Sequence, residues 1–150
     1  TATPKKVWKR PTLVRINDRE IIFGRNDKEN EELTFKVARD NDFWLHVANY
    51  SGSHVIVRNP TKDAELEDTV LVQAAQLAAY HSQARNSSKV EVHYTQCRFV
   101  SKPRKAKYGL VTIRKFKSIM VEPKNCQSNK QSISTNGKKE VKSKGSIERD

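Results

Sequence analysis

Four side chains that could contact a nucleic acid come from two neighbouring apolar runs. Trp44 and His46 belong to Asp42-Phe43-Trp44-Leu45-His46, and His54 and Arg58 follow Ser51-Gly52-Ser53. Because side chains alternate across a strand, strands at 43–47 and 54–58 would gather these four on one face. An indole can stack on a base, an imidazole can form hydrogen bonds, and an arginine can contact a phosphate. Gly52 between two serines predicts a turn whose backbone N–H groups approach a phosphate, with Ser53 beside it.

Other interpretations of the same residues stay open. A tryptophan on such a sheet is often covered by a helix, and both histidines could be buried and bonded to the backbone. Asp42, His46 and His54 could hold a metal or act in a hydrolase, but their spacing matches no known metal-ligand pattern. The sequence also offers no convincing nucleophile with its base and no Walker-type phosphate loop. We therefore expect no enzyme activity, no metal and no cofactor.

The strongest electrostatic signal is a basic segment near the end of the predicted domain. No acidic residue lies between Arg98 and Lys117, and the segment contains eight basic ones: Arg98, Lys102, Arg104, Lys105, Lys107, Arg114, Lys115 and Lys117. We expect two basic loops near one end of a sheet, able to displace counterions from several phosphates. Tyr108 in the first loop could stack on a base. A solvated surface without a partner is the alternative, although clustered like charges repel one another.

A third candidate is Gly24-Arg25-Asn26, a glycine that closes a strand before a helix. Arg25 and Asn26 could face an RNA backbone. Equally, Asn26 or Asp27 could only cap the helix.

Composition agrees with nucleic-acid binding. The chain of 150 residues has a net charge of +12 and a pI of about 9.9. Residues 1–123 carry +8 of that charge, so the predicted domain is itself basic. Two cysteines suggest a reducing compartment, and no apolar run is long enough for a membrane span. Because the first residue is Thr1, we expect a processed protein or a piece of a longer one.

The pattern predicts an α+β fold with a mostly antiparallel sheet of short strands, one long helix and one short helix. Residues 1–11 resemble a linker, 12–123 the domain, and 124–150 a disordered basic tail. We expect hairpins at 12–24 and 43–58, with helices at 28–38, capped by Asn26 or Asp27, and at 65–85. A strand at 90–95 follows, and strands at 110–113 and 118–121 are predicted to form a last hairpin with its turn at 114–117.

The chain resembles the NFACT-R domain in several separated motifs that occur in the same order. They are Gly24-Arg25-Asn26 with Asn30 and Leu33-Thr34, Asp42 to His46, Gly52 to Arg58, Ala74 to Ser82, Val92 to Thr95, Lys102-Pro103, Gly109 to Val111, and Ile119 to Pro123. In a loop that reads Lys-Pro-x-Gly-Ala-x-Pro-Gly in the family, Lys105 and Tyr108 replace a glycine and a proline. The resemblance covers about residues 13–123.

The resemblance implies an RNA-binding module, usually C-terminal in fibronectin-binding-protein-like and nuclear export mediator factor proteins. These proteins bind large ribosomal subunits that hold peptidyl-tRNA after a stall, so the expected partner is rRNA or tRNA on that subunit. A DNA-binding module, or a protein-interaction module that docks on a ribosomal protein, is the alternative. We expect a cytoplasmic protein, with a chloroplast or mitochondrion as the alternative location.

Overall fold

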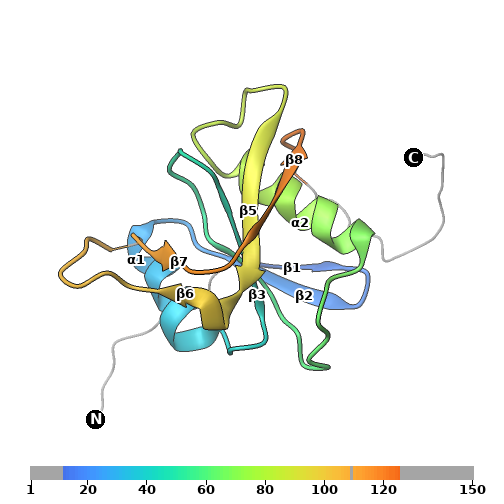
Figure 1. The fold of residues 1–150 in the computed structure, drawn as a ribbon. Helices are drawn as coiled ribbons and strands as arrows, with labels where there is room; N and C mark the ends of the chain where they lie inside the picture. Colours follow the sequence, from blue (N-terminus) through green and yellow to red (C-terminus); the bar gives the residue numbers. More distant parts are fainter. Residues whose placement is uncertain (1–11, 109, 126–150) are drawn as a thin grey trace, which may run out of the picture.

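An antiparallel six-stranded sheet, in the order β1-β2-β4-β3-β5-β8, is the centre of the computed structural model, which describes residues 12–108 and 110–125 (Figure 1). A second, small sheet pairs β6 with β7. The strands are β1 (Thr12–Ile16), β2 (Arg19–Phe23), β3 (Phe43–Val47), β4 (Val55–Val57), β5 (Val90–Gln96), β6 (Val100–Ser101), β7 (Thr112–Ile113) and β8 (Lys117–Val121). The helical segments are α1 (Asp27–Glu32), the π-helical η1 (Leu33–Val37) that continues it, α2 (Asp68–Tyr80) and the 3-10 turn η2 (Cys97–Phe99).

The predicted α+β class with a mostly antiparallel sheet, one long helix and one short helix is confirmed. The predicted hairpins at 12–24 and 43–58 form as β1–β2 and β3–β4. The predicted linker at 1–11 lies outside the described residues, and so does the predicted tail beyond Asn125.

Helix α2 covers one face of the large sheet. Its small residues Ala74 and Ala78 are fully buried together with Leu77. They pack on apolar side chains of the central strands such as Leu45 and Val55. Alanine on the inner side of a helix lets the helix approach a sheet closely, so the alanine-rich sequence of α2 matches its position.

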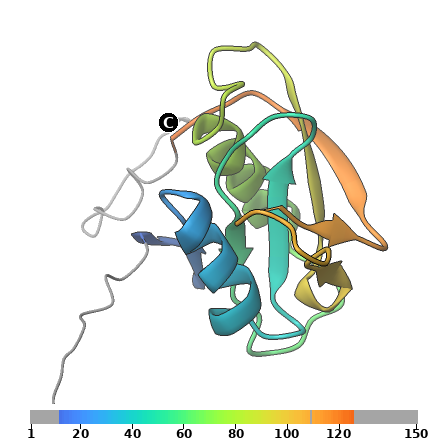
Figure 2. The ribbon, with the colours of Figure 1, turned by 90° about the vertical axis from the view of Figure 1, so that its left-hand side faces the viewer.

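The opposite face of the sheet is covered as well. Leu33 of η1 and Val100 of β6 pack there against Trp44 and Ile56 from the sheet. Figure 2 shows α1 and α2 on either side of the sheet. A strand that is covered on both faces has a continuous run of apolar residues. Strand β4 accordingly consists of three buried residues.

The two helices differ from the predicted ones at their ends. The long helix begins at Asp68 and ends at Tyr80, not at 65 and 85. After Tyr80 the backbone leaves the helix and lies against residues 51–53, where Ser53 N donates a hydrogen bond to His81 O at 2.9 Å. The short helix is capped by Asn26, whose Oδ1 accepts from Glu29 N at 2.9 Å, so the structure selects Asn26 from the two candidate caps, Asn26 and Asp27.

The prediction of a last hairpin between 110–113 and 118–121 is wrong. Strand β7 pairs with β6, and β8 pairs with β5 in the large sheet. The apolar side chains explain the separation: Ile113 packs with the Trp44 cluster, whereas Ile119 and Val121 pack on the α2 side. Residues 114–116 therefore form a crossover between two sheets and not a hairpin turn.

Candidate nucleic-acid interface

Trp44, His46 and His54 lie together, as the strand alternation predicts, but they are not presented to solvent. The ring centroids of Trp44 and His46 are 5.8 Å apart, and those of His46 and His54 are 5.3 Å apart. Trp44 is only 2% exposed and His54 only 1%, because η1 and β6 cover this face. Of the two open interpretations of this face, the structure shows the covered one, and a base cannot reach the indole face in this arrangement.

The polar groups of the three side chains differ in their surroundings. His54 Nδ1 lies 2.7 Å from the hydroxyl oxygen of Thr34. His46 is half-buried, and its burial holds the pKa of its imidazole below the ordinary value. The indole Nε1 of Trp44 is buried without a hydrogen-bond partner among the residues that the structure describes.

Asp42 organises the backbone around it. Its carboxylate accepts from Asn59 N at 2.8 Å and from Arg39 N at 2.9 Å, and it forms an ion pair with Arg58 Nε at 3.0 Å. These contacts occupy both oxygens of the carboxylate. Within residues 12–108 and 110–125, no cluster of three or more His, Cys, Asp and Glu side chains could hold a metal ion.

Gly24 and Gly52 lie where neighbouring parts of the chain leave no space for a side chain. A Cβ at Gly24 would lie 2.2 Å from Asn30 Oδ1, and a Cβ at Gly52 would lie 2.6 Å from Ser82 Cβ. Arg25 is held by Glu29 (Nη2 to Oε2, 2.6 Å), and the buried hydroxyl of Ser53 donates to Gly24 O at 2.6 Å. Of the two open interpretations of Gly24-Arg25-Asn26, the structure favours helix capping.

The loop between β6 and β7, residues 102–111, projects outward from the body of the fold (Figure 1). Arg104, Lys105 and Lys107 are exposed there, and none of them forms an ion pair with a described residue. Tyr108 is 58% exposed beside them. Lys105 has a φ of 60°, in the left-handed region where glycine is favoured, which is where the family loop has its glycine.

Lys102 has a different role from the other loop cations. Its Nζ forms an ion pair with Glu31 Oε1 of α1 at 2.7 Å. The same ammonium donates to the carbonyls of Ala106 and Lys107, each at 3.1 Å. Lys102 therefore closes the loop and fastens it to α1, and the exposed cations of the loop without an ion-pair partner among the described residues are Arg104, Lys105 and Lys107.

A second basic group lies at the other end of the β6–β7 ladder. Arg114 Nη2 donates to Arg98 O at 2.7 Å, and the side chain of Arg98 bonds to Asn41. The cationic groups of Arg114 and Lys115 lie 5.5 Å and 5.6 Å from the ring centroid of Phe99. The basic residues thus flank a short ladder from both ends and do not gather at one end of a sheet as predicted.

We call this set of exposed cations the basic stripe, and it consists of Arg98, Arg104, Lys105, Lys107, Arg114 and Lys115. Lys117, the first residue of β8, lies beside the basic stripe. Its Nζ forms a long ion pair with Glu65 Oε2, at 3.8 Å. A row of cations interleaved with exposed aromatic rings suits a single strand, whose phosphates and bases alternate. Phe99 and Phe116 were not among the residues that spacing singled out, although Arg114-Lys115-Phe116-Lys117 already shows an aromatic residue between cations.

In the described part of the chain, no helix has both the length and the apolar character needed to cross a membrane.

Comparisons with known proteins identify the family of this chain and agree with its fold. A family model described as the NFACT protein RNA binding domain matches residues 9–115. The proteins named Rqc2 homolog RqcH from Bacillus subtilis and Streptococcus pneumoniae are 42% and 38% identical over 103 and 123 residues, covering 69% and 79% of this chain. The chain spans only 17% and 22% of the length of these two relatives.

A solved structure, the C-terminal part of the fibronectin/fibrinogen-binding protein from Streptococcus suis, has a TM-score of 0.73 at 34% identity. That alignment covers 81% of this chain and 49% of the solved chain. The family match extends over more than half of the sequence and the fold agrees, so this chain belongs to the NFACT protein RNA-binding domain family.

Proposed function

We propose that this domain is the RNA-binding module of a ribosome-associated quality-control factor that acts on large subunits holding peptidyl-tRNA after a stall. Family membership and the relatives named Rqc2 homologs support this proposal. The bound RNA is rRNA or tRNA, and the location is the cytoplasm or an organelle with its own ribosomes.

The observation that carries the proposal is the β6–β7 loop. Arg104, Lys105 and Lys107 are exposed in this loop, and none of them has an ion-pair partner among the described residues. Cations that already hold a carboxylate gain little from a phosphate, whereas these three can each displace a counterion from RNA. Lys102, which is paired with Glu31, holds the loop in place for them.

We infer that the domain binds RNA without reacting with it. Two of the three residues of the alternative hydrolase interpretation, Asp42, His46 and His54, form hydrogen bonds within the fold: Asp42 with backbone amides and His54 with Thr34. Binding would instead rest on neutralisation of phosphates by the basic stripe, with stacking on exposed rings such as Tyr108.

The direct test is a filter-binding titration of the chain against structured and single-stranded RNA at several salt concentrations. We expect the logarithm of the association constant to fall linearly with the logarithm of salt concentration. An affinity that does not respond to salt would contradict the phosphate mechanism. Competition with DNA of matched length separates an RNA-binding from a DNA-binding module.

The ribosomal partner needs a second experiment. Crosslinking the chain to purified large subunits with bound peptidyl-tRNA should yield rRNA or tRNA adducts that include the β6–β7 loop. Adducts to a ribosomal protein alone would instead support a protein-interaction module.

A further inference from the structure

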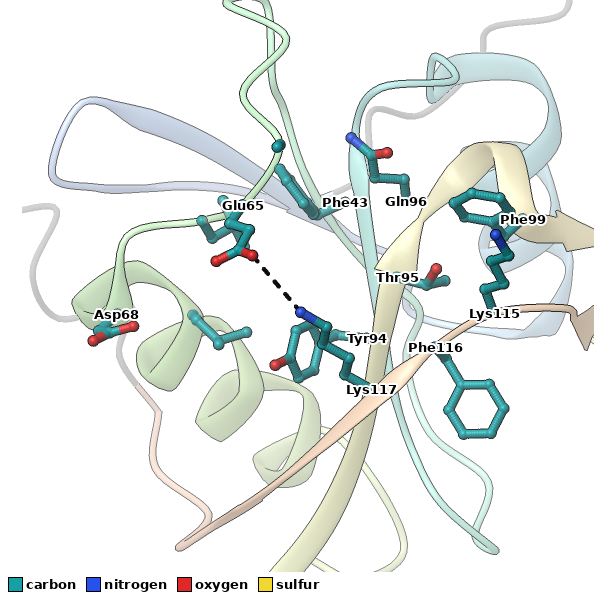
Figure 3. Close-up of a pocket in the computed structure, with 13 residues that line it drawn as sticks. Phe43, Glu65, Asp68, Tyr94, Thr95, Gln96, Phe99, Lys115, Phe116 and Lys117 are labelled. Atoms are coloured by element: carbon teal, nitrogen blue, oxygen red, sulfur yellow. Dashed lines mark ion pairs between the residues drawn. The ribbon is translucent and has the colours of Figure 1, made fainter.

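An open cavity of about 320 Å³ lies at the point where β5 extends beyond its partner β8 (Figure 3). Strand β8 pairs with β5 only from Val90 to Tyr94. Thr95 and Gln96 continue along β3 but have no partner in β8. The sheet therefore opens at this edge, and the cavity lies between the segment that precedes α2 and residues 115–117.

The interior of the cavity is largely aromatic and apolar. Rings of Phe43, Tyr94 and Phe99 line it, together with Leu66 and Leu71. Its volume is near the lower end of the range typical of small-molecule sites, roughly 300–1,000 Å³. Such a space suits one flat ring system and not an extended chain.

The two rims of the cavity carry opposite charges. Lys115 and Lys117 stand on one side, and Glu65 and Asp68 stand on the other (Figure 3). The pair between Lys117 Nζ and Glu65 Oε2 is long, at 3.8 Å, and both side chains are well exposed, at 67% and 79%. A loose, solvated pair of this kind contributes little energy, so each partner can turn to a ligand at small cost.

We infer that this cavity receives one unstacked base of a single-stranded RNA, and that it favours a base with an exocyclic amino group. The inference rests on the proposed function. The phosphates lie along the lysine rim, because the carboxylates of Glu65 and Asp68 repel them. The base enters with its amino edge towards Glu65, since a carboxylate can only accept hydrogen bonds and cytosine N4 donates one.

The cavity is continuous with the basic stripe. Phe99 belongs to the cavity wall, and the cations of Arg114 and Lys115 lie over the same ring. A strand whose base occupies the cavity therefore has its neighbouring phosphates beside cations of the stripe. Stacking in the cavity and phosphate contacts on the rim then act on consecutive parts of one nucleotide strand.

The first test compares oligo-C with oligo-U of equal length, which carry the same charge but differ in the amino group. Ala64 is exposed at the mouth of the cavity, so Ala64→Trp would fill the cavity without removing a charge. We expect this variant to lower oligo-C affinity by about fivefold or more, as loss of a stacked base would. Its salt slope should stay unchanged. Ser88→Trp, in the exposed segment before the opposite end of β5, is the matched control and should behave as the parent chain.

The second test uses Glu65→Gln, which keeps the shape of the side chain but adds a donor. We expect the preference for oligo-C over oligo-U to disappear while oligo-U affinity is retained. Glu122→Gln, an exposed carboxylate beyond β8, is the control for the charge change.

The outcomes separate the two proposals. Parent-like affinity and base preference in both Ala64→Trp and Glu65→Gln would overturn the cavity inference, while salt-dependent RNA binding would still support the proposed function. If the parent chain binds structured RNA but neither oligonucleotide, the cavity inference is wrong and the proposed function stands. If it binds neither structured RNA nor the oligonucleotides in a salt-dependent manner, both are wrong. Thermal unfolding checks that the Ala64→Trp variant is folded. If that variant is not folded, the Glu65→Gln variant alone tests the cavity inference.

Discussion

Lys102 and Glu31, far apart in the sequence, form an ion pair of 2.7 Å that joins the β6–β7 loop to helix α1. The side chains are only 32% and 18% exposed, so the pair is better shielded than the other surface pairs of the stripe region. It explains how a loop with several exposed cations keeps a defined position. The lysine at this place is structural, although the sequence groups it with the phosphate-binding candidates.

Lys102→Ala should therefore lower the free energy of unfolding by about 1 kcal/mol, because it removes a partly shielded ion pair and two hydrogen bonds to loop carbonyls. Urea unfolding followed by tryptophan fluorescence measures the change. Lys107→Ala, which removes an exposed lysine from the same loop, is the control and should leave stability nearly unaltered. Equal effects of the two variants would contradict the structural role of Lys102.

Combined replacement of Arg104, Lys105 and Lys107 by alanine should weaken RNA binding and reduce its salt slope by about 2 for a single strand, as expected when three phosphate contacts are lost. Filter binding over a salt series measures both quantities. Stability should change little, since none of the three side chains is ion-paired with a described residue. An unchanged slope would place the phosphate contacts elsewhere on the molecule.

Trp44→Phe should change the free energy of unfolding by no more than about 1 kcal/mol, because the lost packing is offset by removal of a buried N–H that lacks a described partner. Trp44→Ala should cost about 3–5 kcal/mol, since it opens a cavity beneath η1. RNA affinity of the phenylalanine variant should equal that of the parent. A stable Trp44→Phe variant with weakened RNA binding would show that the indole becomes accessible in the complex.

Lowering the pH below about 6.5 should destabilise the fold. Burial holds the pKa of His46 and of His81 below the ordinary value of 6.5. The folded chain therefore binds fewer protons than the unfolded chain in this range, and stability, complete above pH 6.5, falls as the pH drops below it. The lowered pKa values of Asp63 and Glu67 act only at more acidic pH.

Denaturant unfolding at several pH values measures how steeply the free energy of unfolding falls with decreasing pH. His46→Gln should make this pH dependence shallower. His93→Gln is the comparison variant, because His93 lies opposite His46 in the β3–β5 pair. A slope that is the same in the parent and in His46→Gln would contradict the assignment to His46.

Much of the fold is predictable from local pattern. The hairpin at 12–24, the strand at 43–47 and the alanine-rich helix follow from side-chain alternation and helical spacing, which neighbouring residues determine. The eight cations between Arg98 and Lys117 are likewise evident from the sequence, and the structure keeps most of them exposed.

The tertiary structure alone decided which of these residues are accessible. Alternation places Trp44 and His54 on one face, but it carries no information on whether a distant segment covers that face, and η1 and β6 do so. The partner of β8 depended in the same way on burial, because Ile119 and Val121 gain more against α2 than in a hairpin with β7. The sequence by itself determined the charge and the local elements. Long-range packing decided the pairing of strands, the ion pair of Lys102 with Glu31, and the cavity beside β5, because each joins residues from separate parts of the chain.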